Sequence, residues 1–202
     1  MRKFTAVTTF NQNGLDTYAR RFINSFAINM PIQLMAYAED CTPEPIDNVE
    51  WFDLVTESPE LVTFKNKWAN EPKANGDVTN DPVRSKRRDA GKGFKWDAIR
   101  FSHKVYAIFA AAKRTDADVL IWMDADTICH SAMPIEFLDT FIPEDKDVCF
   151  LGRKDKFSEC GFYSLNLKSK NTQNFLKRFQ EFYDDADNGI FTLDEWHDSF
   201  VF

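Results

Sequence analysis

A run of five apolar residues, Val119–Met123, ends directly on the acidic triplet Asp124-Ala125-Asp126. A short, continuously apolar run is typical of a strand that is buried on both faces, as in a parallel sheet covered by helices. Ligands of such sheets bind beyond the carboxyl ends of the strands. The two aspartates are therefore placed to face a ligand, and the chain needs alternating strands and helices to bury the strand before them.

The rest of the chain supplies that alternation. Further strands are expected over residues 3–10, 32–40, 49–55, 147–152 and 160–167, and helices over 15–26, 94–114 and 172–183. Between them, residues 58–93 lose periodicity and are expected to form a long loop with one short helix near 61–68. We predict an α/β fold in which a mostly parallel central sheet carries helices on both faces. The length of 202 residues favours a single domain, 1–202.

Charge and cysteine usage exclude several classes of protein. The formal net charge of -7 argues against nucleic-acid binding, which usually requires a basic face. The four cysteines contain no C-x-x-C pair and are interpreted as reduced thiols of a cytoplasmic protein. No apolar stretch is long enough for a membrane span or a secretion signal. The chain stops on the apolar SFVF, which leaves open that a C-terminal region is missing.

The Asp-X-Asp pattern occurs at other places, where its context differs. Residues 116–118 and 145–147 precede strands and are expected to form solvated turns at the opposite edge of the sheet. The segment 184–195, DDADNGIFTLDE, partly matches a calcium-binding EF-hand loop, but its third position is Ala186. For Asp124 and Asp126, spacing alone leaves two interpretations open. They hold a divalent cation with carboxylate oxygens, or they cap a turn.

Several segments together resemble glycosyltransferases of the GT-A fold. They are the strand end TTFN, a basic helix, the strand end WMDADT, the segment ECGFYSLN and the terminal EWHDS. The resemblance implies a Rossmann-type α/β sandwich that binds a nucleotide sugar, most often a UDP-sugar. It also implies that Asp124 lies on the ribose side or binds the metal through water, while Asp126 binds Mn²⁺ or Mg²⁺ directly. That cation holds the donor diphosphate and neutralises the charge of the leaving group.

The resemblance assigns further donor-binding positions. The loop after the first strand is expected to hold the base and ribose, and the helix before the metal strand to hold the phosphates. Later in the chain, a glutamate reaches the sugar hydroxyls and a glycine allows close approach of the sugar. In this sequence the loop positions are Thr8, Thr9 and Asn11, and the helix positions are Arg100 and Lys104. The glutamate is Glu159 and the glycine is Gly161. An ordinary solvated helix face is the alternative for Arg100 and Lys104.

The terminal EWHDS resembles the acidic segment that lies opposite the metal in these enzymes. If the enzyme inverts configuration, Asp198 is the candidate general base, with Glu195 or Asp194 as substitutes. If it retains configuration, the same carboxylates orient the acceptor. His197 is the candidate third metal ligand, although the family histidine usually lies further downstream. Water or a residue beyond Phe202 are the alternatives.

A basic run, Arg84, Lys86, Arg87, Arg88 and Lys92, lies in the long loop. It is either a solvated loop or a lid that closes on the donor diphosphate or meets an anionic acceptor. We expect a glycosyltransferase acting on a saccharide or another hydroxyl acceptor. The alternatives are a non-catalytic or degenerate nucleotide-sugar binding module and a nucleotidyltransferase on a similar sheet. The chain lacks G-x-x-x-x-G-K-[ST], which argues against the common nucleotide hydrolases.

Overall fold

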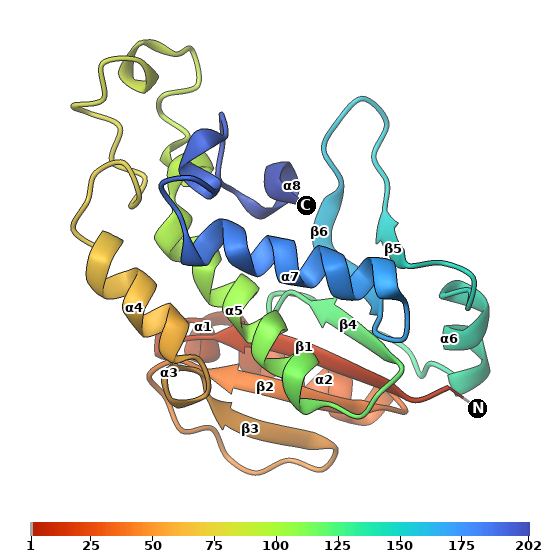
Figure 1. Ribbon diagram of the computed structural model, residues 1–202. Helices are drawn as coiled ribbons and strands as arrows, with labels where there is room; N and C mark the ends of the chain where they lie inside the picture. Colours follow the sequence, from red (N-terminus) through yellow and green to blue (C-terminus); the bar gives the residue numbers. More distant parts are fainter. Residues whose placement is uncertain (1) are drawn as a thin grey trace.

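A six-stranded sheet forms the centre of the protein in the computed structural model, which describes residues 2–202 (Figure 1). Its order is β3-β2-β1-β4-β6-β5. The strands are β1 (Phe4–Phe10), β2 (Gln33–Ala38), β3 (Val49–Asp53), β4 (Val119–Met123), β5 (Val148–Leu151) and β6 (Glu159–Asn166). The first four strands pair in parallel, and β6 runs antiparallel to both β4 and β5. The prediction of a mostly parallel sheet is confirmed.

Helices cover both faces of this sheet. Figure 1 shows α4, α5 and α7 on one side and α1 and α2 on the other. The helical elements are α1 (Gln12–Gly14), η1 (Leu15–Ala19), α2 (Arg20–Asn29), α3 (Leu54–Glu57), α4 (Pro59–Trp68), η2 (Arg84–Lys86), η3 (Gly93–Trp96), α5 (Ala98–Arg114), α6 (Ile135–Phe141), α7 (Lys170–Asp184), η4 (Ile190–Thr192) and α8 (Asp198–Val201). None of those within residues 2–202 is both long and apolar enough to cross a bilayer.

Strand β4 shows why both faces need cover. Its residues are all buried, and alternate side chains enter two different cores. Leu120 and Trp122 pack with α4, α5 and α7, whereas Ile121 and Met123 pack with α2 and α6. Since successive side chains of a strand point to opposite faces, a strand without polar alternation requires an apolar layer on each side.

Local caps move several element boundaries away from the predicted ones. The first helical segment begins at Gln12, before the predicted residue 15, because Asn11 Oδ1 accepts the Gly14 N–H at 2.8 Å. The third strand ends at Asp53, whose side chain accepts the Thr56 N–H at 2.6 Å and starts α3. The predicted helix 94–114 is a short η3 followed by α5, which Asp97 caps. Helix α6 has no counterpart among the predicted elements.

The C-terminal segment folds back against η3, at the end of the long loop. The N–H of Trp196 donates to Lys95 O at 2.7 Å, and Trp96 Nε1 donates to Asp194 O at 2.9 Å. Both tryptophans are almost completely buried, with exposed fractions of 0% for Trp96 and 1% for Trp196. These contacts bring residues 195–198 beside the carboxyl ends of the parallel strands.

Candidate functional site

A cavity of about 540 Å³ lies at the carboxyl ends of β1, β2 and β4, and we call it the strand-end cavity. Asn11, Glu39 and Asp124 directly follow these three strands and line it. The side chains that line it from the sequence-based set are Thr9, Asn11, Arg100, Lys104, Asp124, Asp126 and Asp198. The fold therefore brings predicted residues from four distant parts of the chain to one cavity, as expected for parallel strands that end at a common edge.

Lys104 connects the two sides of this cavity. Its side chain is 9% exposed, and Nζ lies 3.1 Å from Asp124 Oδ1 and 2.6 Å from Asp198 Oδ2. Nζ also donates to the carbonyl oxygen of Cys160 at 2.5 Å. Burial lowers the pKa of Lys104, but the two carboxylates more than offset that effect and raise it above the ordinary value. Lys104 is therefore a buried cation that links the end of β4 to α8.

Asp124 is held in place by several donors. Besides Lys104, Trp122 Nε1 donates to its Oδ1 at 2.7 Å, and its own N–H donates to Gly161 O at 2.8 Å. Burial raises the pKa of the Asp124 carboxyl, and the contacts with Lys104 and Trp122 act in the opposite direction. The other oxygen, Oδ2, lies toward Gly161, where an added Cβ would be 3.3 Å away. The side chain thus has one oxygen bound by the protein and one that faces the glycine.

The donor set suits a hard divalent cation. Asp124 Oδ2 and the carboxylate of exposed Asp126 accept no hydrogen bond from residues 2–202. Within that range no three His, Cys, Asp or Glu side chains are grouped as a complete metal site. Mg²⁺ and, by the same oxygen preference, Mn²⁺ are held by one or two carboxylates together with waters and phosphate oxygens. Asp124 and Asp126 fit that mode of binding.

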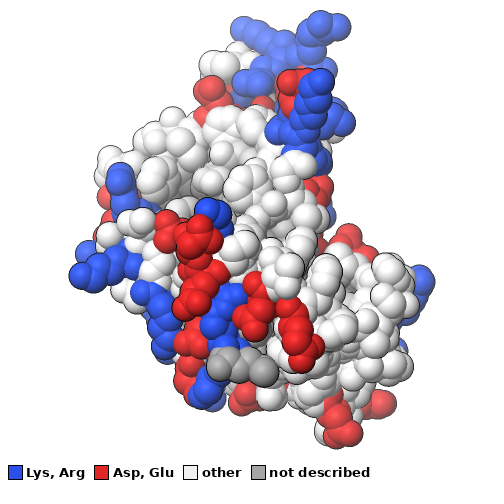
Figure 2. Space-filling model, turned by 90° about the vertical axis from the view of Figure 1, so that its right-hand side faces the viewer, with Lys and Arg blue, Asp and Glu red and all other residues white. Residues whose placement is uncertain are grey.

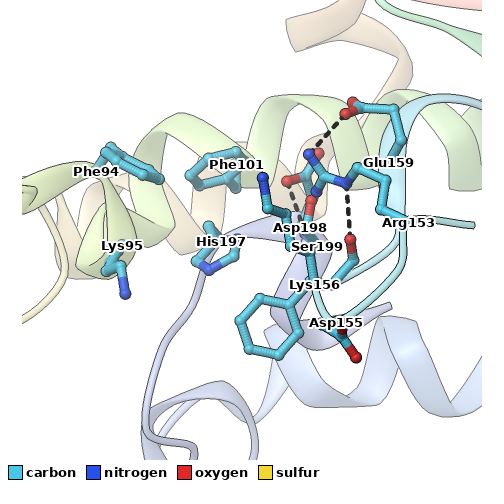
Figure 3. A pocket seen from close by; sticks show the side chains of 11 residues that line it. Phe94, Lys95, Phe101, Arg153, Asp155, Lys156, Glu159, His197, Asp198 and Ser199 are labelled. Atoms are coloured by element: carbon cyan, nitrogen blue, oxygen red, sulfur yellow. Dashed lines mark hydrogen bonds and ion pairs between the residues drawn. The ribbon is translucent and has the colours of Figure 1, made fainter.

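A second cavity, of about 860 Å³, adjoins the first, and we call it the C-terminal cavity. Phe101 and Asp198 line both. In Figure 3, His197, Asp198 and Ser199 of the terminal segment line it together with Phe94 and Lys95 on one side and Arg153 and Glu159 on the other. His197 Nε2 lies 2.9 Å from Glu195 Oε2. Asp198 therefore stands at the junction of two spaces.

Comparisons of sequence find no matching family model and no matching curated protein. The structure, in contrast, is similar to mouse xyloside xylosyltransferase 1 in its apo form, with a TM-score of 0.53, 13% identity and coverage of 99% of this chain and 80% of that chain. The galactosyltransferase LgtC with donor and acceptor sugar analogs has a TM-score of 0.51 at 11% identity, with coverage of 97% and 69%. The bifunctional glycosyltransferase WbbM has 0.50 at 12%, with coverage of 89% and 34%. The chain has the GT-A fold.

Within this GT-A fold, the remaining predicted residues lie at different places. Thr8 is completely buried and lines neither cavity, so its side chain faces the core. Glu159 lines the C-terminal cavity and forms an ion pair with Arg153 at 3.0 Å. His197 also lines only that cavity. Its role as a metal ligand stays a prediction, and it would require the His197 ring to reach the strand-end cavity, which it does not line.

Some residues of the strand-end cavity were missed by the sequence analysis. Glu39 Oε2 lies 2.5 Å from His103 Nδ1, and its Oε1 lies 3.4 Å from the Thr9 hydroxyl. Tyr18 contributes an aromatic ring from η1. Glu39 carried the same signal as Asp124, because it is an acidic residue directly after a buried strand. The positions of His103 and Tyr18 depend on how α5 and η1 pack, which their spacing does not show.

The other acidic triplets are occupied by protein contacts. Exposed Asp116 and Asp145 pair with Lys3 and Lys146 at 2.6 and 2.7 Å, as expected for surface turns. In the EF-hand-like segment, Asp184 accepts the Tyr106 hydroxyl at 2.8 Å, while Glu195 binds Lys95 and His197. Both end positions of that segment are therefore already engaged by protein groups, which does not favour the calcium-site interpretation.

Proposed function

We propose that the protein is a metal-dependent glycosyltransferase that moves a sugar from a nucleotide-sugar donor, a UDP-sugar, to a hydroxyl acceptor. The observation that carries the proposal is the pair Asp124 and Asp126 at the end of buried β4, lining a cavity at the ligand edge of a GT-A fold. The xylosyltransferase and galactosyltransferase of similar structure support the reaction class. Because their sequence identity to this chain is low, that support comes from the shared fold alone.

The charge of the strand-end cavity supports the need for a cation. Five carboxylates line it, those of Glu39, Asp97, Asp124, Asp126 and Asp198. The basic side chains Arg100 and Lys104 do not balance them, and Lys104 is already paired. A diphosphate adds further negative charge, so it binds there only with an added cation. Mn²⁺ or Mg²⁺ at Asp124 and Asp126 supplies the charge that stabilises the leaving diphosphate.

The protein's own groups divide the remaining tasks. Arg100 is exposed, lines the cavity and forms no ion pair with residues 2–202, so it is available to the donor phosphates. Lys104 acts indirectly, by holding Asp124 and Asp198 in place. Asp198 Oδ1 accepts the Ser199 N–H at 2.8 Å, and its carboxylate reaches both cavities. From that position it orients an acceptor hydroxyl or accepts its proton.

Calorimetry with UDP tests this proposal. We expect binding that requires Mn²⁺ or Mg²⁺ and that Asp126→Ala weakens by about 100-fold, because a direct metal ligand matters at least as much as the groups that orient ligands. Asp145→Ala is the matched control, since Asp145 belongs to an Asp-X-Asp turn that lines neither cavity. Equal UDP binding without metal, or in Asp126→Ala, would overturn the proposal.

Turnover separates an enzyme from a binding module. A panel of UDP-sugars incubated with Mn²⁺ is expected to include one from which the protein slowly releases UDP by transfer to water. Release should fall to background in Asp126→Ala. Metal-dependent binding of UDP with no release from any member of the panel would instead favour the non-catalytic module.

Gly161→Ala tests whether the Asp124 carboxylate lies close to the backbone at Gly161. The added Cβ would lie 3.3 Å from both Asp124 Oδ2 and Glu159 Oε1, so these oxygens must shift slightly. We expect metal-dependent UDP binding to weaken by about threefold to tenfold, with less than ~1 kcal/mol lost from the free energy of unfolding. Gly152→Ala is the control, because its Cβ meets nothing within 4 Å. Equal UDP affinity for the two variants would contradict the placement of Asp124.

A further inference from the structure

Two basic loops border the C-terminal cavity. One, residues 152–158, joins β5 to β6 and supplies lining residues of the cavity. The other, residues 84–92, lies behind the cavity wall, where Asp89 pairs with the lining residue Lys95 at 2.7 Å. In Figure 1 they rise on either side of α8, and Figure 2 shows Lys and Arg gathered at the same end of the molecule. The exposed basic residues of these loops that form no ion pair with residues 2–202 define a basic rim: Lys86, Arg88, Lys92, Lys154 and Lys156.

Other basic residues of the same loops have structural partners. Arg84 binds Asp81 at 2.8 Å and lies over the Trp196 ring at 4.5 Å. Arg153 pairs with Glu159 and donates to the Phe157 carbonyl oxygen at 2.8 Å. These residues hold the loops, whereas the five members of the basic rim form no ion pair and outnumber the exposed Asp155 between them, in a chain whose net charge is -7. A local excess of positive charge on an acidic protein attracts an anionic ligand to that place.

The cavity between the loops also has aromatic walls. Phe94 of η3 is 45% exposed, Phe157 of the loop 152–158 is 48% exposed, and both line the cavity. Their ring centroids lie 5.9 and 5.8 Å from the ring of His197. Exposed aromatic rings that line a cavity are typical of ligand-binding grooves. A sugar ring has an apolar face of C–H groups that can cover them.

The position of the basic rim favours the acceptor over the donor. None of its members lines the strand-end cavity, where Asp124 and Asp126 lie, whereas Lys156 lines the C-terminal cavity directly. The interpretation of the loop as a lid on the donor diphosphate therefore has less support than contact with an acceptor. A nucleic acid is disfavoured because the net charge of the chain is -7.

We propose that the acceptor is an anionic saccharide. Its ring lies between Phe94 and Phe157, its reacting hydroxyl faces Asp198, and its carboxylate, phosphate or sulfate groups contact the basic rim. The proposal rests on the glycosyltransferase function, because Asp198 joins the acceptor space to the cavity of the metal and donor.

Dextran sulfate and uncharged dextran of equal chain length test the proposal without a donor. By calorimetry, we expect dextran sulfate to bind at least ~10-fold more tightly, with an affinity that falls as salt is raised. Lys156→Ala combined with Arg88→Ala should weaken its binding about 10-fold. Arg21→Ala combined with Lys170→Ala is the matched control, because these residues are also exposed and unpaired within residues 2–202 but border neither cavity. Phe157→Ala should weaken binding at least ~3-fold.

Equal binding of dextran and dextran sulfate would overturn the proposal, as would equal losses in the two double variants or no effect of Phe157→Ala. Tighter binding of a single-stranded DNA oligonucleotide of equal charge, with the same dependence on Lys156 and Arg88, would replace the saccharide by a nucleic acid. Metal-dependent UDP binding should be unchanged in all these variants. Failure of the acceptor proposal with intact UDP binding is therefore distinguishable from failure of the proposed glycosyltransferase function.

Discussion

Lys104→Met is expected to lower the free energy of unfolding by about 3–5 kcal/mol, the usual cost of removing one partner from a buried ion pair. Methionine keeps the apolar stem as far as the ε position but leaves Asp124 and Asp198 near each other without their shared cation. Urea denaturation at pH 7 measures the change. Because the pKa of Lys104 lies above its ordinary 10.5 in the folded protein, its contribution is fully present below that pH and is lost only as the pH rises through the folded value.

Two further variants test the cause of that loss. Lys177→Met is the matched control, since its side chain is 76% exposed on α7, and its expected change is within ~0.5 kcal/mol. Adding Asp198→Asn to Lys104→Met removes one uncompensated charge and should restore part of the stability. If Lys104→Met unfolds at the same urea concentration as the unchanged protein, the ion pairs with Asp124 and Asp198 do not hold the site together.

The sequence predicted the sheet and the ligand edge because both follow from local patterns. The run Val119–Met123 is apolar at every position, so it had to be a strand covered on two faces, and the carboxylates after it had to lie at the strand end. The same rule separated Asp124 and Asp126 from the turns at Asp116 and Asp145, which are surface ion pairs in the structure. These inferences needed no knowledge of how distant segments pack.

The different roles of Arg100 and Lys104 could not be obtained in that way. Their spacing of four residues places them on one face of α5, and the sequence offered both to the donor phosphates. In the structure Arg100 is exposed, whereas Lys104 is buried by β4 and by a segment 94 residues further along the chain. The contact between His103 and Glu39 likewise joins elements that are far apart in sequence. Burial of a helix position depends on tertiary packing, which spacing alone does not determine.

Trp196→Ala is expected to cost about 3–5 kcal/mol of unfolding free energy, the usual loss for a large aromatic side chain in a core. Trp196 is 1% exposed, packs edge-on against Phe191 at 4.8 Å and supports Arg84 over its ring. Phe137→Ala is the matched control, because Phe137 is half exposed on α6, and its expected loss is below ~1 kcal/mol. Thermal or urea unfolding followed by circular dichroism measures both variants.

The number of unfolding transitions in Trp196→Ala then tests whether the C-terminal segment unfolds together with the rest of the protein. Trp196 belongs to the same core as Trp122 and Tyr163 of the sheet, so its loss should move one cooperative transition to lower urea. His197, Asp198 and Ser199, which follow Trp196, line the C-terminal cavity, whereas Asp124 and Asp126 are placed by β4. Below the transition, dextran sulfate binding should therefore weaken more than metal-dependent UDP binding. Two separate transitions would contradict the shared core and show that the terminal segment unfolds on its own.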